Sequence, residues 1–154
     1  MDTISKRAEM IDSTSWGSGF NWSQLTELAI YMEYFEVMKG EILLREGEKS
    51  RYLTLVVEGV LAVNKGETTD ISQRIAVVNQ GGTFGEMSLF DNEPRSATVV
   101  AATDAKLLIM NEKDFNSMVN KTPALAILFV MKIAKLLSQR LRRTSGRLVD
   151  FQTP

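Results

Sequence analysis

The chain has 154 residues, 44% of them hydrophobic and 24% charged, with a formal net charge of −1. This is enough for one folded domain with its own apolar core, and there is no overall charge that would recruit nucleic acid. Cysteine and histidine are both absent, which excludes disulfide frameworks, cysteine nucleophiles, Cys/His zinc sites and every catalytic arrangement that uses a histidine base. An enzyme with this composition would have to work with carboxylates, lysines or hydroxyls alone; we expect a protein that is not an enzyme, with no catalytic residue, metal or cofactor.

No secretory leader is expected, because no charged and then apolar segment opens the sequence. Residues 1–22 mix Ser, Thr and Gly without periodicity and are expected to form an N-terminal extension, loose or docked. Asn21 and Gln24 then have the spacing of a helix capping box, and apolar residues follow at helical spacing from Leu25 to Phe35. The pattern predicts one N-terminal helix.

From residue 37 to residue 111 the sequence changes to short β-type runs punctuated by glycine. The predicted strands are residues 42–45, 52–58, 60–65, 74–78, 97–102 and 106–110. Glycine supplies the positive φ that turns need, and short strands at this spacing are typical of a sandwich or barrel. We expect an antiparallel β-roll of the jelly-roll type, which leaves few open sheet edges.

The remainder returns to helix. Residues 112–120 and 124–144 are predicted helices, and Pro123 suits a first helical position. Residues 124–131 are apolar all round, which implies burial on more than one side, either in a homodimer seam or against the β-roll. The fold class is α+β, with the main domain at 23–144 and a C-terminal tail at 145–154. The apolar run at 124–131 is far shorter than the ~20 residues that span a bilayer, so we expect a cytoplasmic protein with no membrane segment.

The segment that carries chemistry is residues 84–99, FGEMSLFDNEPRSATV. Gly85 permits close backbone approach, and Glu86 and Arg95 stand nine residues apart around a short turn. A guanidinium fork together with backbone N–H groups from a short helix starting near Met87 would suit a buried phosphate. A carboxylate beside it is a suitable acceptor for a ribose hydroxyl.

These residues resemble the phosphate-binding cassette of the cyclic nucleotide-binding domain family, roughly F-G-E-x-x-L followed by P-R-x-A-T. The matching residues are Phe84, Gly85, Glu86, Leu89, Pro94, Arg95, Ala97 and Thr98. The likeness continues upstream through 40–48, 53–63 and 79–86, and covers about residues 23–144 in all. We call residues 84–99 the cassette.

The resemblance implies that Glu86 accepts from the ribose 2′-OH and that Arg95 clamps the cyclic phosphate. The phosphate and ribose site would comprise Gly85, Glu86, Met87, Ser88, Arg95, Ser96 and Ala97, several of them through backbone amides. The base would lie near Val63 and Ala76, with Arg140 or Leu141 on the last helix acting as a lid.

The ligand is expected to be cyclic AMP or cyclic GMP. In the family a threonine after the arginine often accompanies cyclic GMP and an alanine cyclic AMP; Ser96 stands between the two, and we favour cyclic AMP.

Three hypotheses about function remain open. The leading one is a stand-alone sensor that passes its state to an unknown effector protein through movement of the C-terminal helices. No direct DNA binding is expected, because about ten residues follow the long helix and a helix-turn-helix needs two further helices; the alternative is the sensor part of a longer transcription regulator. The third is a structural β-roll that binds no nucleotide, in which Glu86 and Arg95 form a salt bridge that braces a turn.

Overall fold

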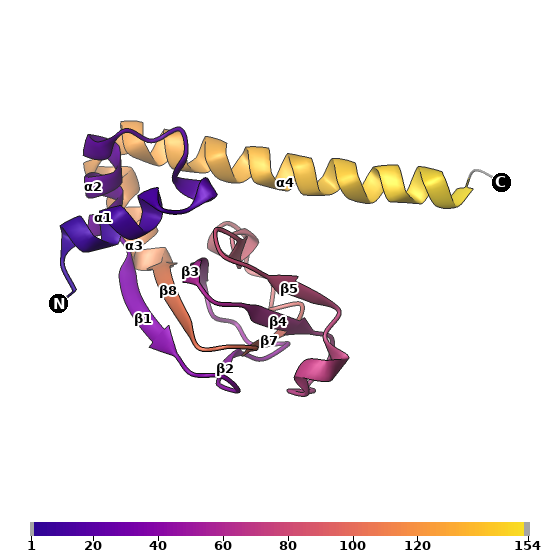
Figure 1. Cartoon of the computed structure of the whole chain (residues 1–154). Coiled ribbons are helices and arrows are strands. Elements are labelled where there is room, and N and C mark those ends of the chain that lie inside the picture. Colours follow the sequence, from indigo (N-terminus) through magenta and orange to yellow (C-terminus); the bar gives the residue numbers. More distant parts are fainter. Residues whose placement is uncertain (1, 153–154) are drawn as a thin grey trace. The chain divides into compact units, whose positions relative to one another are not determined.

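The computed structural model describes residues 2–152, with side chains for residues 2–146. The chain divides into two units, Met1–Ser117 and Met118–Pro154, which are described separately. Figure 1 shows the course of the chain through its helices and strands.

The first unit is built around eight strands in two antiparallel sheets. One sheet has the order β1-β8-β3-β6, with bounds Glu33–Val37, Ala105–Asn111, Tyr52–Glu58 and Thr83–Phe84. The other has the order β2-β7-β4-β5, with bounds Ile42–Leu44, Thr98–Ala101, Leu61–Asn64 and Ala76–Val78. The antiparallel β-roll is thus confirmed, and all six predicted strands are present.

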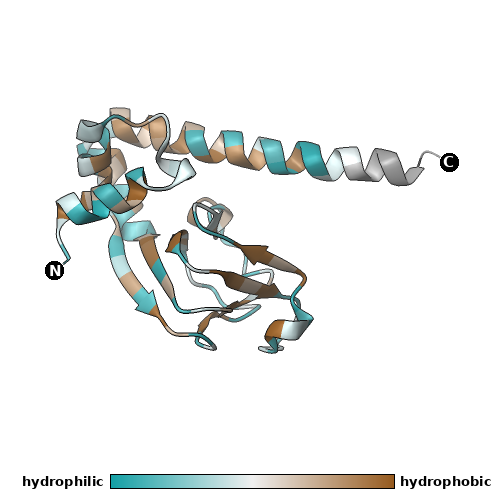
Figure 2. Ribbon diagram, in the orientation of Figure 1, coloured by the Kyte–Doolittle hydropathy of each residue, from teal (hydrophilic) through white to brown (hydrophobic). Residues whose placement is uncertain are grey.

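The core of the roll comes from side chains of both sheets. Its buried cluster consists of Leu44, Val56, Leu61, Val99, Ala101, Ala105 and Leu107. Figure 2 shows the apolar character of β4 and β5 in brown, whereas β1 includes hydrophilic residues in teal. Burial of this apolar surface is the main favourable term in folding the roll.

The N-terminal extension was predicted wrongly in part, because it contains a helix. Helix α1 spans Ile4–Asp12, and the side chain of Thr3 caps it by accepting from the Lys6 N–H. Ala8 and Ile11 are fully buried, one helical turn apart, and Arg7 Nη1 donates to the carbonyl of Met32 at 2.7 Å. This helix of nine residues buries only two side chains, and a helix so short owes its stability to packing and not to local propensity. The chain therefore has two N-terminal helices where one was expected.

Helix α2 spans Trp22–Ile30, and both bonds of the Asn21–Gln24 capping box are formed at 2.9 Å. The prediction that this helix continues to Phe35 was wrong, because α2 ends at Ile30 and Phe35 lies in β1, opposite Leu107 of β8. Strand pairing with residues about 70 positions away overrides the local helical pattern here. The same reason explains why β1 and β6 were not predicted.

The last helices are α3, Glu112–Lys121, and α4, Pro123–Gln152. Pro123 is the first residue of α4, as predicted, but the expected tail at 145–154 was wrong as far as Gln152, since α4 continues through it; residues 153–154 lie outside the described residues. Gly146 alone costs only about 1 kcal/mol in a helix and does not end it. Among the described helices none is long and apolar enough to cross a bilayer.

Burial along α4 changes midway. The buried residues, Leu125, Ala126, Phe129 and Ile133, all lie in its first three turns. Every residue from Ser138 to Gly146 is exposed. The second half of the helix thus has little buried surface to hold it in place.

Candidate functional site

The two ends of the cassette meet at Gly85 and Arg95. Gly85 has φ of +80°, and a Cβ there would collide with Arg95 Nη1 and lie 2.5 Å from the carbonyl oxygen of Tyr52. The Arg95 guanidinium therefore lies directly against the Gly85 backbone. The short 3-10 helix η3, Met87–Leu89, follows at once, close to the predicted start at Met87.

Arg95 is held at both its backbone and its side chain by the segment that leads into β3. Its N–H donates to the Glu48 carbonyl and its carbonyl accepts from the Gly47 N–H, both at 2.8 Å. The guanidinium donates through Nη2 to the Tyr52 carbonyl at 2.8 Å and through Nε to Ser50 Oγ at 3.3 Å. The guanidinium carbon also lies 4.6 Å from the centroid of the Tyr52 ring. The residue is only 7% exposed.

The neighbours that touch this guanidinium carry no negative charge. Among the described residues no carboxylate oxygen lies within 4.0 Å of it, so the salt bridge to Glu86 considered above is not formed. Burial lowers the pKa of Arg95, partly offset by Tyr52 and Glu48, yet an arginine stays protonated at any physiological pH. Only two of its five N–H donors are used in this part of the chain, which leaves a buried cation able to accept an anion.

Glu86 and Ser88 follow Gly85 closely in the sequence but differ in the groups they can offer to a ligand. The Glu86 side chain is buried, with 3% exposed. The Ser88 N–H donates to the Gly85 carbonyl at 3.1 Å, so this donor is used within the turn, and the place of Ser88 in a ligand site stays a prediction. Its hydroxyl lies 2.6 Å from the same carbonyl oxygen and 3.3 Å from that of Tyr52, and Ser88 thus braces the turn.

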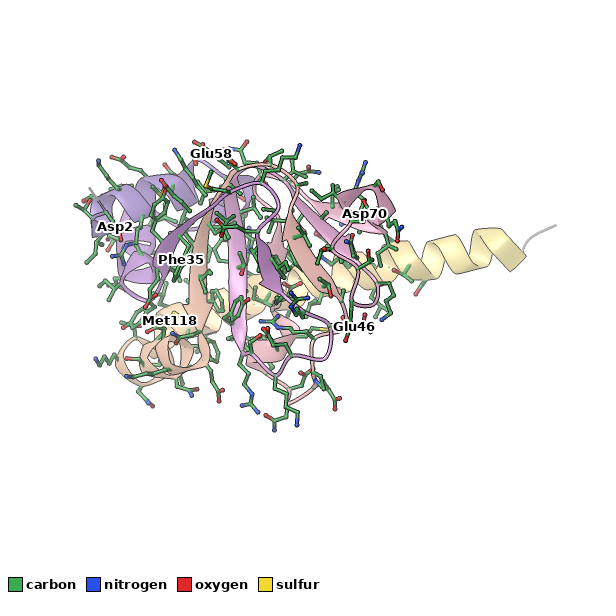
Figure 3. All side chains as sticks on the ribbon, turned by 90° about the horizontal axis from the view of Figure 1, so that it is seen from below. Asp2, Phe35, Glu46, Glu58, Asp70 and Met118 are labelled. Carbon is green, nitrogen blue, oxygen red and sulfur yellow. The ribbon has the colours of Figure 1, made fainter. Side chains whose placement is uncertain are left out.

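The peptide after Arg95 is oriented by the loop between β4 and β5. Lys65 Nζ donates to the Ser96 carbonyl at 2.8 Å and lies 3.6 Å from Glu46, labelled in Figure 3. Glu46 also accepts from the Gly66 N–H. Because a trans peptide points its C=O and N–H in opposite directions, the Ala97 N–H faces away from Lys65. No hydrogen bond described for this region uses the N–H of Met87, Ser96 or Ala97.

Val63 and Ala76, expected near the base, are direct partners across β4 and β5. Val63 is half-buried and Ala76 exposed, so together they present a small apolar surface on the sheet that contains β7. Arg140 and Leu141 lie on α4 in the second unit, outside the geometry described for the cassette; Leu141 is 67% exposed.

Sequence reasoning missed Ser50 and Tyr52. Tyr52 appeared only as the first residue of a predicted strand. Its contact with Arg95 joins residues 43 positions apart, and no local pattern carries that information. Over the described residues, no group of three or more acidic, Cys or His side chains is arranged to hold a metal ion.

The comparison with known proteins agrees with this geometry. The family model described as "Cyclic nucleotide-binding domain" matches residues 34–122. The chain belongs to this family. The matched residues include the cassette and, apart from the first residue of β1, the whole β-roll.

Individual relatives are distant in sequence. A cyclic nucleotide-gated potassium channel of Mesorhizobium japonicum is 33% identical over 105 residues, covering 68% of this chain and 28% of the channel. The cyclic AMP receptor protein of Thermus thermophilus is 29% identical, covering 79% of this chain and 56% of the receptor. The chain thus spans only part of the length of these curated relatives. A solved cyclic nucleotide-binding domain from Methylobacillus flagellatus superimposes with a TM-score of 0.78 at 26% identity, covering 96% of this chain and 83% of that one.

The cassette geometry makes a prediction about glycine. Gly85→Ala should destabilise the domain more than Gly40→Ala. Both positions have positive φ, which costs a non-glycine residue about 1–2 kcal/mol, but a Cβ at Gly40 has no neighbour within 4 Å. The added loss at Gly85 measures the crowding against Arg95 and Tyr52, and urea unfolding of both variants would reveal it. Equal losses for the two variants would show that the cassette ends do not meet as described.

Proposed function

We propose that this domain binds a cyclic purine mononucleotide, with cyclic AMP favoured over cyclic GMP, and acts as a sensor without catalysing a reaction. The observation that carries the proposal is the buried Arg95 guanidinium, which has unused donors and lies against the Gly85 backbone. A buried cation with neutral neighbours is stabilised by an anionic ligand, and a guanidinium fork matches two phosphate oxygens.

The other cassette groups complete the proposed site. The N–H groups of Met87, Ser96 and Ala97 are the candidates for further phosphate contacts, since the hydrogen bonds described above do not use them. Glu86 is proposed to accept from the ribose 2′-OH, which is the one hydroxyl left free when the 3′ and 5′ oxygens form the cyclic phosphate. Val63 and Ala76 would contact the base.

The preference for cyclic AMP rests on two supports. Ser96 is not the threonine that often accompanies cyclic GMP, and the similar Thermus protein is named a cyclic AMP receptor. Other relatives are named cGMP-dependent protein kinases, so a binding measurement has to decide between the adenine and the guanine nucleotide.

The transmission step is proposed to use α4. Residues from Ser138 onward have no buried side chain up to Gly146, and segments with few buried contacts open locally at low cost. A nucleotide that contacts Arg140 or Leu141 in one state only would shift α4 toward that state, and an effector protein would detect the change. The exposed apolar residues of its first half, Ile127, Leu128, Val130 and Met131, support a partner surface there, including the homodimer considered above.

The central test is the substitution Arg95→Ala. Loss of one partner of a buried charge pair costs about 2–5 kcal/mol, so the affinity for cyclic AMP should fall by about 30-fold or more in titration calorimetry. Arg74→Ala is the matched control, because Arg74 is exposed and its guanidinium bonds only the Ile71 carbonyl among the described residues. A folded Arg95→Ala protein that binds within threefold of the wild type would reject the assignment.

The same titration extended to cyclic GMP, 2′-deoxy cyclic AMP and linear AMP resolves the ligand. We expect cyclic AMP to bind best and the 2′-deoxy nucleotide to bind poorly, because it leaves the buried Glu86 carboxylate without its hydroxyl. Equal affinity for the ribose and 2′-deoxy forms would remove Glu86 from the site.

A prediction for transmission concerns hydrogen exchange along α4. Saturating cyclic AMP should slow exchange of backbone amides at residues 136–149, while residues 124–133, which contain the buried positions, change less. Removal of the chain after Leu137 should weaken binding and spare the fold. If exchange slows only within residues 84–99 and the shortened protein binds normally, the signal does not travel through α4.

A further inference from the structure

Tyr52 contacts the Arg95 guanidinium in two ways at once. Its carbonyl oxygen accepts from Arg95 Nη2 at 2.8 Å, and its ring lies under the guanidinium carbon at 4.6 Å. Ser50, two residues earlier, accepts from Nε at 3.3 Å. Among the described residues, Ser50 and Tyr52 make both hydrogen bonds of the guanidinium and its one contact with an aromatic ring.

The Tyr52 ring is itself fixed. Its hydroxyl donates to the Leu43 carbonyl at 3.1 Å, and its ring packs against the buried cluster of the roll. Burial raises the pKa of Tyr52, so the phenol stays neutral at physiological pH and supplies no counter-charge. The ring is therefore a rigid, uncharged platform anchored in the core.

We propose that Tyr52 is a positioning residue that holds the Arg95 guanidinium in its ligand-binding orientation before the ligand arrives. This inference rests on the proposed function, since it assigns to Arg95 the capture of an anion. An arginine side chain has several rotatable bonds, and fixing them in advance removes an ordering cost that binding would otherwise include. The ring face attracts the cation by its quadrupole without neutralising it, so the charge stays available for a phosphate.

The competing explanation is that Tyr52 is an ordinary core residue. The core role and the positioning role predict different effects of substitution. A core role depends on apolar volume, whereas the positioning role depends on the aromatic face and acts only through Arg95. The phenolic hydroxyl donates to the Leu43 carbonyl and also interacts with Ser50, whereas the contact with the cation is made by the ring face, which Phe keeps.

The experiment measures the affinity for cyclic AMP by calorimetry in Tyr52→Leu, Tyr52→Met and Tyr52→Phe, each alone and combined with Arg95→Ala. From the usual strength of a cation–π contact, Leu and Met should weaken binding by about 2- to 30-fold, and Phe should restore most of that loss. In the Arg95→Ala background, studied at millimolar nucleotide, the same substitutions should have no further effect.

The controls separate this inference from the proposed function. Tyr34→Leu removes a half-buried tyrosine of β1, whose hydroxyl bonds Glu36, and should leave the affinity unchanged. Thermal unfolding shows which variants are folded; Met serves if Leu does not fold. If folded Tyr52→Leu or Tyr52→Met binds cyclic AMP with the same affinity as the wild type, the inference is overturned and the proposed function stands. So does an equal loss in both Arg95 backgrounds, which would make Tyr52 a core residue only. A wild-type protein that binds no cyclic nucleotide overturns both.

Discussion

The buried guanidinium of Arg95 is the constraint around which the site is built. A cation that is 7% exposed has lost most of its hydration, and the groups that replace the water here are a carbonyl, a hydroxyl and an aromatic ring. These uncharged neighbours fix the orientation of the charge, and the Glu48 carboxylate, which accepts from Ser50, attracts it from beyond them. A carboxylate in their place would stabilise the empty protein more and would compete with any anionic ligand.

The fold supplies these neighbours from parts of the chain that are distant in sequence. The segment Gly47–Tyr52 approaches the cassette because β3 and β6 pair, which places Thr54 opposite Phe84. The Arg95 backbone is tied to residues 47 and 48, while the loop after β4 holds the next peptide through Lys65. The positive φ of Gly85 then brings the two ends of the cassette into contact. Contacts from both sheets and from one loop thus fix Arg95 and the peptide that follows it.

The sequence predicted well those features that are local. The six strands, the capping box at Asn21 and the start of α4 at Pro123 each depend on a few neighbouring residues. The cassette was identifiable because its residues are contiguous. The failures involve long-range contacts: β1 exists because it pairs with β8, and α1 because it packs on α2. The roles of Ser50 and Tyr52 were also not predicted, because the local sequence does not show which residues will contact an arginine more than 40 positions away.

The central claim is that Arg95 is kept for binding and not for stability, and the free energy of unfolding of Arg95→Met tests it most directly. Met has similar length without the charge, and replacement of a buried charge by an apolar residue is often neutral or stabilising. We predict that the ligand-free variant unfolds with a free energy equal to or above that of the wild type. Cyclic AMP at about 100 times its Kd should stabilise the wild type by about 2.7 kcal/mol and the variant by much less. A ligand-free Arg95→Met protein destabilised by about 3 kcal/mol or more would contradict the claim and make Arg95 a structural brace of the cassette.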